Sequence, residues 1–227
     1  MIIITGASKG VGKFLFDKYT SLGETVYGTF NKSIIGNAVG NGTYSQVNVV
    51  NYQEVEEWVK SINLSEKITL INCAGISYNA FAHKSEVEKW KKVIEVNLIG
   101  TYNVIRAFLP FMRDHEFGRI INFSSVAAQK GTPGTSAYAA SKSALWGLVK
   151  SIAVENASKG ITINNINLGY SELGMIEQVP EKYKEIIKAQ IPNGKFCDKE
   201  DIFSCVEFIR SNTYLNGSSV DLNGGIF

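Results

Sequence analysis

The sequence predicts a doubly wound α/β fold, in which a seven-stranded parallel sheet carries helices on both faces. Apolar runs rich in Ile, Val and Thr alternate along the chain with segments of amphipathic helical period. A glycine-rich stretch directly follows the first of these runs. The chain has 227 residues, of which 44% are hydrophobic and 19% charged, which is enough for a sizeable core. We therefore expect residues 1–227 to form a single domain.

Seven segments have the composition of strands, namely residues 2–5, 25–29, 44–49, 68–72, 119–123, 161–167 and 219–222. Helical patterns fill most of the intervals, at residues 11–22, 52–62, 86–113, 137–158 and 199–211. The stretch NKSIIGNAVGNGTYSQ, residues 31–46, interrupts the alternation because its Gly and Asn residues favour a loop. Another stretch, EKYKEIIKAQIP, fits either a solvated helix or a lid over a substrate.

Charge and cysteine content argue against several classes of protein. The net charge is +2, with no block of like charges, so we expect no nucleic-acid or membrane partner. Three cysteines without a CxxC pair indicate neither a disulfide framework nor a zinc site, and they favour a cytoplasmic location. No apolar run reaches the roughly 20 residues of a membrane span. His83 and His115 lack neighbours at ligand spacing, so no metal site is expected.

The stretch IIITGASKGVG, residues 2–12, is the first candidate ligand site. Gly6, Gly10 and Gly12 lie between a predicted strand and a predicted helix, and doubly wound sheets bind ligands at the carboxyl ends of strands. Their spacing fits neither GxxxxGK[ST] nor GxGxxG. Glycines let the backbone approach a ligand, and the helix would offer free N–H groups to a pyrophosphate. The alternative is an ordinary glycine-rich turn.

Further motifs favour a dinucleotide site. The stretches LINCAGIS, VIEVNLIGTYNV, GRIINFSSVAAQKG and GTSAYAASKSALWG follow in that order, and the chain ends in VDLNGGIF. Together with TGASKGVG they resemble the short-chain dehydrogenase/reductase family, whose TGxxxGxG, NNAG and YxxxK appear here as TGASKGVG, NCAG and YAASK. The resemblance covers essentially the whole chain and points most closely to the 3-oxoacyl-carrier-protein reductases and related carbonyl reductases. It implies a Rossmann-type fold.

The resemblance also implies the residues of the site. The catalytic residues that it implies are Asn97, Ser125, Tyr138 and Lys142. The residues that it implies for cofactor binding are Gly6, Ser8, Lys9, Gly10, Val11, Gly12, Thr29, Asn31, Lys32, Asn48, Val49, Asn72, Cys73, Ala74, Gly75, Tyr138, Lys142 and Gly169.

The chemistry of Tyr138 and Lys142 follows from their residue types. Four residues apart on a predicted helix, they share one face. Lowering a phenol pKa from about 10 to about 7 needs roughly 4 kcal/mol, which an ammonium about 4 Å away supplies at an effective dielectric of about 20. We therefore expect Lys142 to lower the pKa of Tyr138. An isolated YxxxK is more often a core Tyr with a solvated Lys, but the surrounding motifs favour the catalytic pair.

Ser125 and Asn97 complete the expected set. The Ser125 hydroxyl could hold the substrate oxygen, whereas Ser124 should point to the opposite side of its strand. Asn is a poor helix former, so Asn97 is unusual inside residues 86–113. By itself it is equally consistent with a surface Asn. The resemblance implies that it distorts the helix and joins Lys142, through water, in a proton relay.

Three positions depart from the family pattern. Leu168 stands in place of a Pro, and Leu173 stands in place of a Thr that contacts the nicotinamide amide, so cofactor geometry differs on that side. Asn48 replaces an Asp that commonly contacts adenine, although its carbonyl can still accept a hydrogen bond.

The end of the second predicted strand indicates which dinucleotide binds. An NAD site places an acid there for the ribose hydroxyl, but here Thr29 occupies that position. Lys9 and Lys32 could attract a 2′-phosphate, although each fits an ordinary exposed lysine as well. We therefore expect NADP(H).

These features predict an NADPH-dependent oxidoreductase that acts on a ketone or secondary alcohol. The alternative is a non-catalytic NADP(H)-binding module with a regulatory or redox-sensing role. Family members that reduce carrier-protein substrates tend to have basic residues near the active-site entrance, so Asp114 and Glu116 argue mildly against a carrier protein. A small ketone, a sugar-derived ketone or a free acyl chain stays open. Apolar faces at residues 86–113 and 137–158 and the end GGIF correspond to the family's pairing surfaces, so we expect a homotetramer or homodimer.

Overall fold

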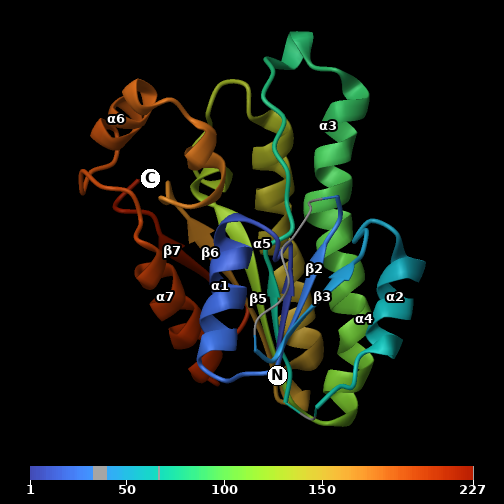
Figure 1. The fold of residues 1–227 in the computed structure, drawn as a ribbon. Helices are drawn as coiled ribbons and strands as arrows, with labels where there is room; N and C mark the ends of the chain where they lie inside the picture. The colour runs from blue at the N-terminus through green and yellow to red at the C-terminus, as the bar shows by residue number, and fades with distance from the viewer. Residues whose placement is uncertain (33–39, 66, 227) are drawn as a thin grey trace.

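The structure, a computed structural model, describes residues 1–32, 40–65 and 67–226. Seven strands of these residues form one parallel sheet in the order β3-β2-β1-β4-β5-β6-β7 (Figure 1). They are β1 (Ile2–Thr5), β2 (Val26–Phe30), β3 (Gly42–Gln46), β4 (Thr69–Asn72), β5 (Gly118–Ser125), β6 (Ile161–Leu168) and β7 (Ser219–Leu222). The strand order reverses between β1 and β4, which creates a crevice at their carboxyl ends. The predicted fold class is confirmed.

The sequence prediction placed the third strand at residues 44–49, which is too far along the chain. β3 ends at Gln46, and Val47 and Val49 follow it into the core, where they are 4% and 7% exposed. Their apolar character reflects burial after the strand rather than pairing within it. Of the loop expected at residues 31–46, residues 33–39 lie outside the described residues, and Gly42–Gln46 form β3 instead of a loop.

Helices cover both faces of the sheet (Figure 1). They are α1 (Gly10–Ser21), α2 (Tyr52–Ser61), α3 (Val87–Ile94), α4 (Gly100–Asp114), α5 (Ser136–Asn156), α6 (Glu181–Ala189) and α7 (Lys199–Ser211). The side chains of α1 and α7 pack on one face, and those of α2, α4 and α5 pack on the other. The sheet is therefore buried on both faces. None of the described helices is both long and apolar enough to cross a membrane.

The alternation of β1 shows why the strand is apolar throughout. Ile3 packs with the side chains of α2, α4 and α5, whereas Ile2 and Ile4 pack with those of α1 and α7. All three side chains are fully buried. A strand covered on both sides needs apolar residues at every position, which explains the continuous run read in the sequence.

A row of polar side chains crosses the sheet near its carboxyl edge. Thr5, Asn72, Asn122, Asn165 and Ser219 are register partners on β1, β4, β5, β6 and β7. Each side chain hydrogen-bonds the next, at 3.4, 2.9, 3.2 and 3.1 Å in turn. We call this row the amide ladder. It satisfies amides whose burial without partners would cost stability.

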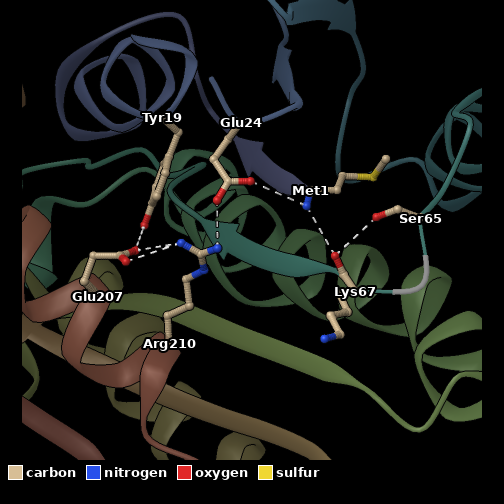
Figure 2. A network of polar contacts seen from close by, with 7 residues as sticks. All are labelled: Met1, Tyr19, Glu24, Ser65, Lys67, Glu207 and Arg210. Carbon is tan, nitrogen blue, oxygen red and sulfur yellow. Dashed lines mark hydrogen bonds and ion pairs between the residues drawn. The ribbon is translucent and has the colours of Figure 1, made fainter. Parts of the chain in front are cut away.

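At the opposite edge, hydrogen bonds and ion pairs join α1 and the segment that follows it to α7 and to Met1 (Figure 2). Arg210 contacts Glu24 at 2.9 Å and Glu207 at 3.2 Å, and Glu207 also accepts a hydrogen bond of 2.6 Å from Tyr19. Glu24 lies 3.8 Å from the amino group of Met1. Burial, followed by the hydrogen bond to Glu207, raises the pKa of Tyr19. Since Tyr19 is fully buried, its hydroxyl requires this partner.

Candidate active site

The glycine loop between β1 and α1 forms the floor of the site. Gly6 and Gly10 have φ values of 67° and 54°, which side chains rarely adopt. A Cβ at Gly12 would lie 2.4 Å from the carbonyl oxygen of Gly6, so only glycine fits there. The first turn of α1 contains no acid, and its N-cap Lys9 makes no capping bond through its side chain. The free N–H groups at this helix start therefore suit a pyrophosphate, as the family's nicotinamide cofactor requires.

The segment after β4 packs tightly against the glycine loop. A Cβ at Gly6 would lie 2.8 Å from the backbone of Ala74, and a Cβ at Gly12 would lie 3.2 Å from the Cβ of Cys73. Burial raises the pKa of Cys73 to about 12, so its thiol stays protonated. Of the three residues expected here to bind the cofactor, Cys73 and Ala74 lie beside the glycine loop, whereas Gly75 lies next to Asn97 and Lys142.

The end of β2 requires one correction. Thr29 was expected to face the cofactor, but its side chain is 1% exposed and its carbonyl oxygen accepts a hydrogen bond of 2.8 Å from Ala7. The strand is still paired with β3 at this position, which keeps Thr29 inside the sheet. Asn31, Lys32 and Lys9 are exposed near this edge, and neither lysine pairs with a carboxylate of the described residues.

The loop after β3 carries Asn48 and Val49. Asn48 Oδ1 accepts a 3.3 Å hydrogen bond from the N–H of Val50, which leaves it one further lone pair for a ligand. Asn103 of α4, which sequence reasoning missed, donates to the carbonyl oxygens of Val49 and Val50 at 3.0 and 3.1 Å. Asn103 thereby fixes the loop against α4. Its only sequence signal was an Asn within a helical pattern.

Three of the four predicted catalytic side chains meet where β5 ends and α5 begins. Ser125 is the last residue of β5, and Tyr138 and Lys142 lie one helical turn apart on α5. Burial raises the pKa of Tyr138, and hydrogen bonding with Ser125 lowers it by a smaller amount. Ser124 instead bonds the carbonyl oxygen of Lys142 at 3.1 Å, and Trp146 donates to it. The two serines point apart, as strand alternation predicts.

Lys142 does not act on Tyr138 as the sequence argument expected. Its Nζ lies 5.6 Å from the centre of the Tyr138 ring and donates a 2.6 Å hydrogen bond to the carbonyl oxygen of Phe123. Lys142 is 6% exposed, and burial lowers its pKa to about 8. The pKa of Tyr138 is raised rather than lowered, because desolvation of the phenol outweighs its hydrogen bond with Ser125. A protonated phenol suits proton donation.

Asn97 lies in a π-helical turn, Glu95–Ile99, that joins α3 to α4. The predicted helix distortion is thus present. Its side chain accepts a 2.8 Å hydrogen bond from the N–H of Ile76 and donates to the carbonyl oxygen of Ile76 at 2.9 Å. A Cβ at Gly75 would lie 3.3 Å from Asn97 Oδ1 and 3.7 Å from Lys142 Nζ. A side chain at position 75 would therefore crowd both groups.

Other predicted cofactor residues divide into two groups. Ser8 and Val11 are partly exposed at the glycine loop, whereas Asn72 is buried and its side chain hydrogen-bonds within the amide ladder. Gly169, after β6, is required because a Cβ there would lie 2.7 Å from the Cα of Asn223.

The segment after β6 closes one side of the site. Leu173 is partly buried and directly precedes Gly174, whose Cα lies 2.9 Å from the position of a Cβ at Gly10. Only two glycines can meet this closely. The Leu173 side chain cannot supply the hydrogen bond that a Thr would give. The helix α6 that follows buries none of its residues and exposes Tyr183 and Ile186, as either predicted role would allow.

The acidic residues near Arg113 do not border this site. Asp114 ends α4 and Glu116 precedes β5, so both lie at the amino end of a strand whose carboxyl end carries Ser125. The argument against a carrier-protein substrate therefore has no structural basis within one chain. No group of three or more His, Cys, Asp or Glu residues in the described part of the chain could hold a metal ion.

Comparison with known proteins agrees with this arrangement. Residues 1–184 match the family model described as short chain dehydrogenase. The chain is 35% identical to an acetoacetyl-CoA reductase of Rhizobium meliloti, over 98% of this chain and 96% of that protein. It is 32% identical to a 3-oxoacyl-[acyl-carrier-protein] reductase of Rickettsia bellii, over 99% and 95% of the two chains.

A solved structure supports the same assignment. The 3-oxoacyl-[acyl-carrier protein] reductase of Brucella melitensis has a TM-score of 0.89 and 25% sequence identity, covering 99% of this chain and 90% of that chain. With its seven-stranded parallel sheet and its Ser, Tyr and Lys at one strand end, this chain belongs to the short-chain dehydrogenase family of oxidoreductases.

Proposed function

We propose that the protein is an NADPH-dependent reductase of 3-oxoacyl thioesters. The observation that carries the proposal is the placement of Ser125, Tyr138 and Lys142 beside a glycine loop built for a pyrophosphate. The named relatives act on acetoacetyl-CoA and on 3-oxoacyl carrier proteins, and both substrates present a ketone two carbons from a thioester. Asp114 and Glu116 lie at the amino end of β5, away from Ser125, so they do not oppose either carrier.

The four side chains divide the work of reduction. When bound, the nicotinamide cofactor supplies the hydride for the carbonyl carbon. Ser125 and Tyr138 hold the carbonyl oxygen through their hydroxyl groups, and Tyr138 transfers its proton to that oxygen. Lys142 and Asn97 border the space beside Gly75, where a water molecule can return a proton to Tyr138. The positive charge of Lys142 favours the phenolate that proton transfer leaves.

NADPH is the proposed cofactor because the end of β2 has no acid that would repel a 2′-phosphate, and lysines near it would attract one. Its sequence, VYGTF, ends without an acid, and Lys9 and Lys32 are exposed nearby. Both lysines lack partners among the described carboxylates, so both are available to a 2′-phosphate. The loss of the Thr hydroxyl at Leu173 affects only the nicotinamide side.

The proposal is tested by turnover. Purified protein is mixed with NADPH and acetoacetyl-CoA, and NADPH oxidation is followed at 340 nm. We expect turnover, and Tyr138→Phe should lower kcat by at least a hundredfold without weakening NADPH binding, because only the hydroxyl is removed. Tyr214→Phe, at a side chain 98% exposed near the opposite edge, is the control and should keep full activity.

Two outcomes would contradict the proposal. Binding of NADPH without oxidation, over a panel that also includes 3-oxoacyl carrier protein and simple ketones, would favour a non-catalytic binding module. Turnover that survives Tyr138→Phe with less than tenfold loss would show that another group donates the proton.

A further inference from the structure

Ser141 connects Asn97 to the helix that carries Tyr138 and Lys142. It has no role in the mechanism proposed above. It is the residue before Lys142 on α5 and is fully buried. Its hydroxyl donates a 2.7 Å hydrogen bond to the carbonyl oxygen of Tyr138. The hydroxyl oxygen of Ser141 in turn accepts a 3.0 Å hydrogen bond from Asn97 Nδ2. Ser141 therefore connects the π-helical turn to the helix that carries Tyr138 and Lys142.

The hydrogen bonds of Asn97 show what this connection does. Its oxygen and one amide hydrogen are used by the backbone of Ile76, and Ser141 takes the second amide hydrogen. The two bonds with the backbone of Ile76 determine the orientation of the Asn97 amide, that is, the positions of its oxygen and its nitrogen. Ser141 supplies the one side-chain hydrogen bond to Asn97 that comes from α5, so it sets the position of the amide relative to Lys142.

A purely structural serine would not need this geometry. A helical Ser commonly bonds a carbonyl oxygen in the preceding turn of its own helix, and that bond alone would satisfy it. Here the hydroxyl also accepts a hydrogen bond from another helix segment in a fully buried position. Removing it would leave an amide hydrogen of Asn97 without an acceptor, which favours reorientation of the side chain.

We propose that Ser141 is a positioning residue for proton return to Tyr138, acting through Asn97. The role rests on the reductase function proposed above. Ser141 touches neither substrate nor cofactor, so its loss should slow the step that Asn97 serves without affecting cofactor binding. Replacing Asn97 should therefore lower kcat only slightly in a variant that already lacks the Ser141 hydroxyl.

The test is a double-mutant cycle of Ser141→Ala and Asn97→Ala, with kcat, KM for NADPH and the solvent isotope effect on kcat measured for all four proteins. We expect Ser141→Ala to lower kcat about tenfold, to leave KM within twofold and to raise the solvent isotope effect. In the Asn97→Ala background, the same change should cost less than twofold. Ser151→Ala, exposed on the same helix, should match the wild type.

The outcomes separate this role from the proposed function. Wild-type turnover with losses that multiply across the cycle would overturn the role of Ser141 alone. Absence of turnover in the wild type would overturn both proposals. Ala is smaller than Ser and a better helix former, so the variant should fold, which circular dichroism checks. If it does not fold, the nearly isosteric Ser141→Cys enters the same cycle under the same criteria.

Discussion

At the scale of single residues, Lys142 sets the pH range in which the proposed reduction can operate. Burial lowers its pKa to about 8, so the ammonium loses its proton as the pH rises through that value. Tyr138 stays protonated over this range because burial raises its pKa. We therefore expect kcat/KM for NADPH, which reports the free enzyme, to fall above about pH 8.

The pH profile has a matched control. Lys159→Ala removes a lysine that pairs with Glu116 at the opposite edge, so its profile should overlay that of the wild type. A wild-type profile that stays level to pH 10 would mean that the charge of Lys142 is not needed.

The choice of nucleotide also depends on individual residues. Each exposed lysine contact with a phosphate is worth about 1 kcal/mol, so Lys9→Ala and Lys32→Ala should each lower kcat/KM for NADPH about fivefold. The values for NADH should stay constant, because NADH lacks the 2′-phosphate. Steady-state kinetics with both nucleotides measures the change. Equal or better use of NADH by the wild type would refute the assignment.

At the scale of elements, the amide ladder ties five strands together below the site. Asn122 lies in its middle, donates to Asn165 and accepts from Asn72. Asn122→Ala would leave two buried amide groups short of a partner, and each orphaned group costs about 1–3 kcal/mol. We expect the free energy of unfolding to fall by about 2–4 kcal/mol in urea titrations. The exposed Asn63→Ala is the control, and an equal effect there would argue against the ladder.

At the scale of the whole molecule, several apolar side chains lack cover in one chain. Ile99 and Tyr102 are each 45% exposed beside and on α4, and Val154 on α5 is 83% exposed. The edge strand β7 pairs only with β6 among the described residues. We propose that these surfaces pair two or four copies with closed symmetry. Light scattering at micromolar concentration should give a dimer or tetramer mass.

A double substitution tests where the copies meet. Tyr102→Asp together with Val154→Asp places charges on the two helices, which should lower the mass toward a monomer because a buried unpaired charge is costly. Phe208→Asp, 53% exposed on α7, is the control and should keep the wild-type mass. A monomeric wild type would contradict the proposal.

The sequence by itself determined the order of the strands and most helices, and it supplied the residues proposed for the site. Strands buried on both faces read as continuous apolar runs, and α7 and β7 have the predicted bounds. Gly6 and Gly12 can be recognised in the sequence because close contacts exclude any residue with a Cβ at these two positions. Each signal can be recognised from a single residue type or a short run, although the contacts that require Gly6 and Gly12 come partly from the distant segment after β4.

Only the tertiary structure decided which polar groups meet. Thr29 and Asn72 turned inward because sheet register pairs them with neighbours far along the chain. The pKa of Tyr138 is set by desolvation from packed elements rather than by Lys142 alone, so helical spacing could not predict its direction. The bonds of Ser141 and Asn103 join separate segments in the same way. Burial and long-range hydrogen bonding arise only when distant segments pack, and single positions carry no record of them.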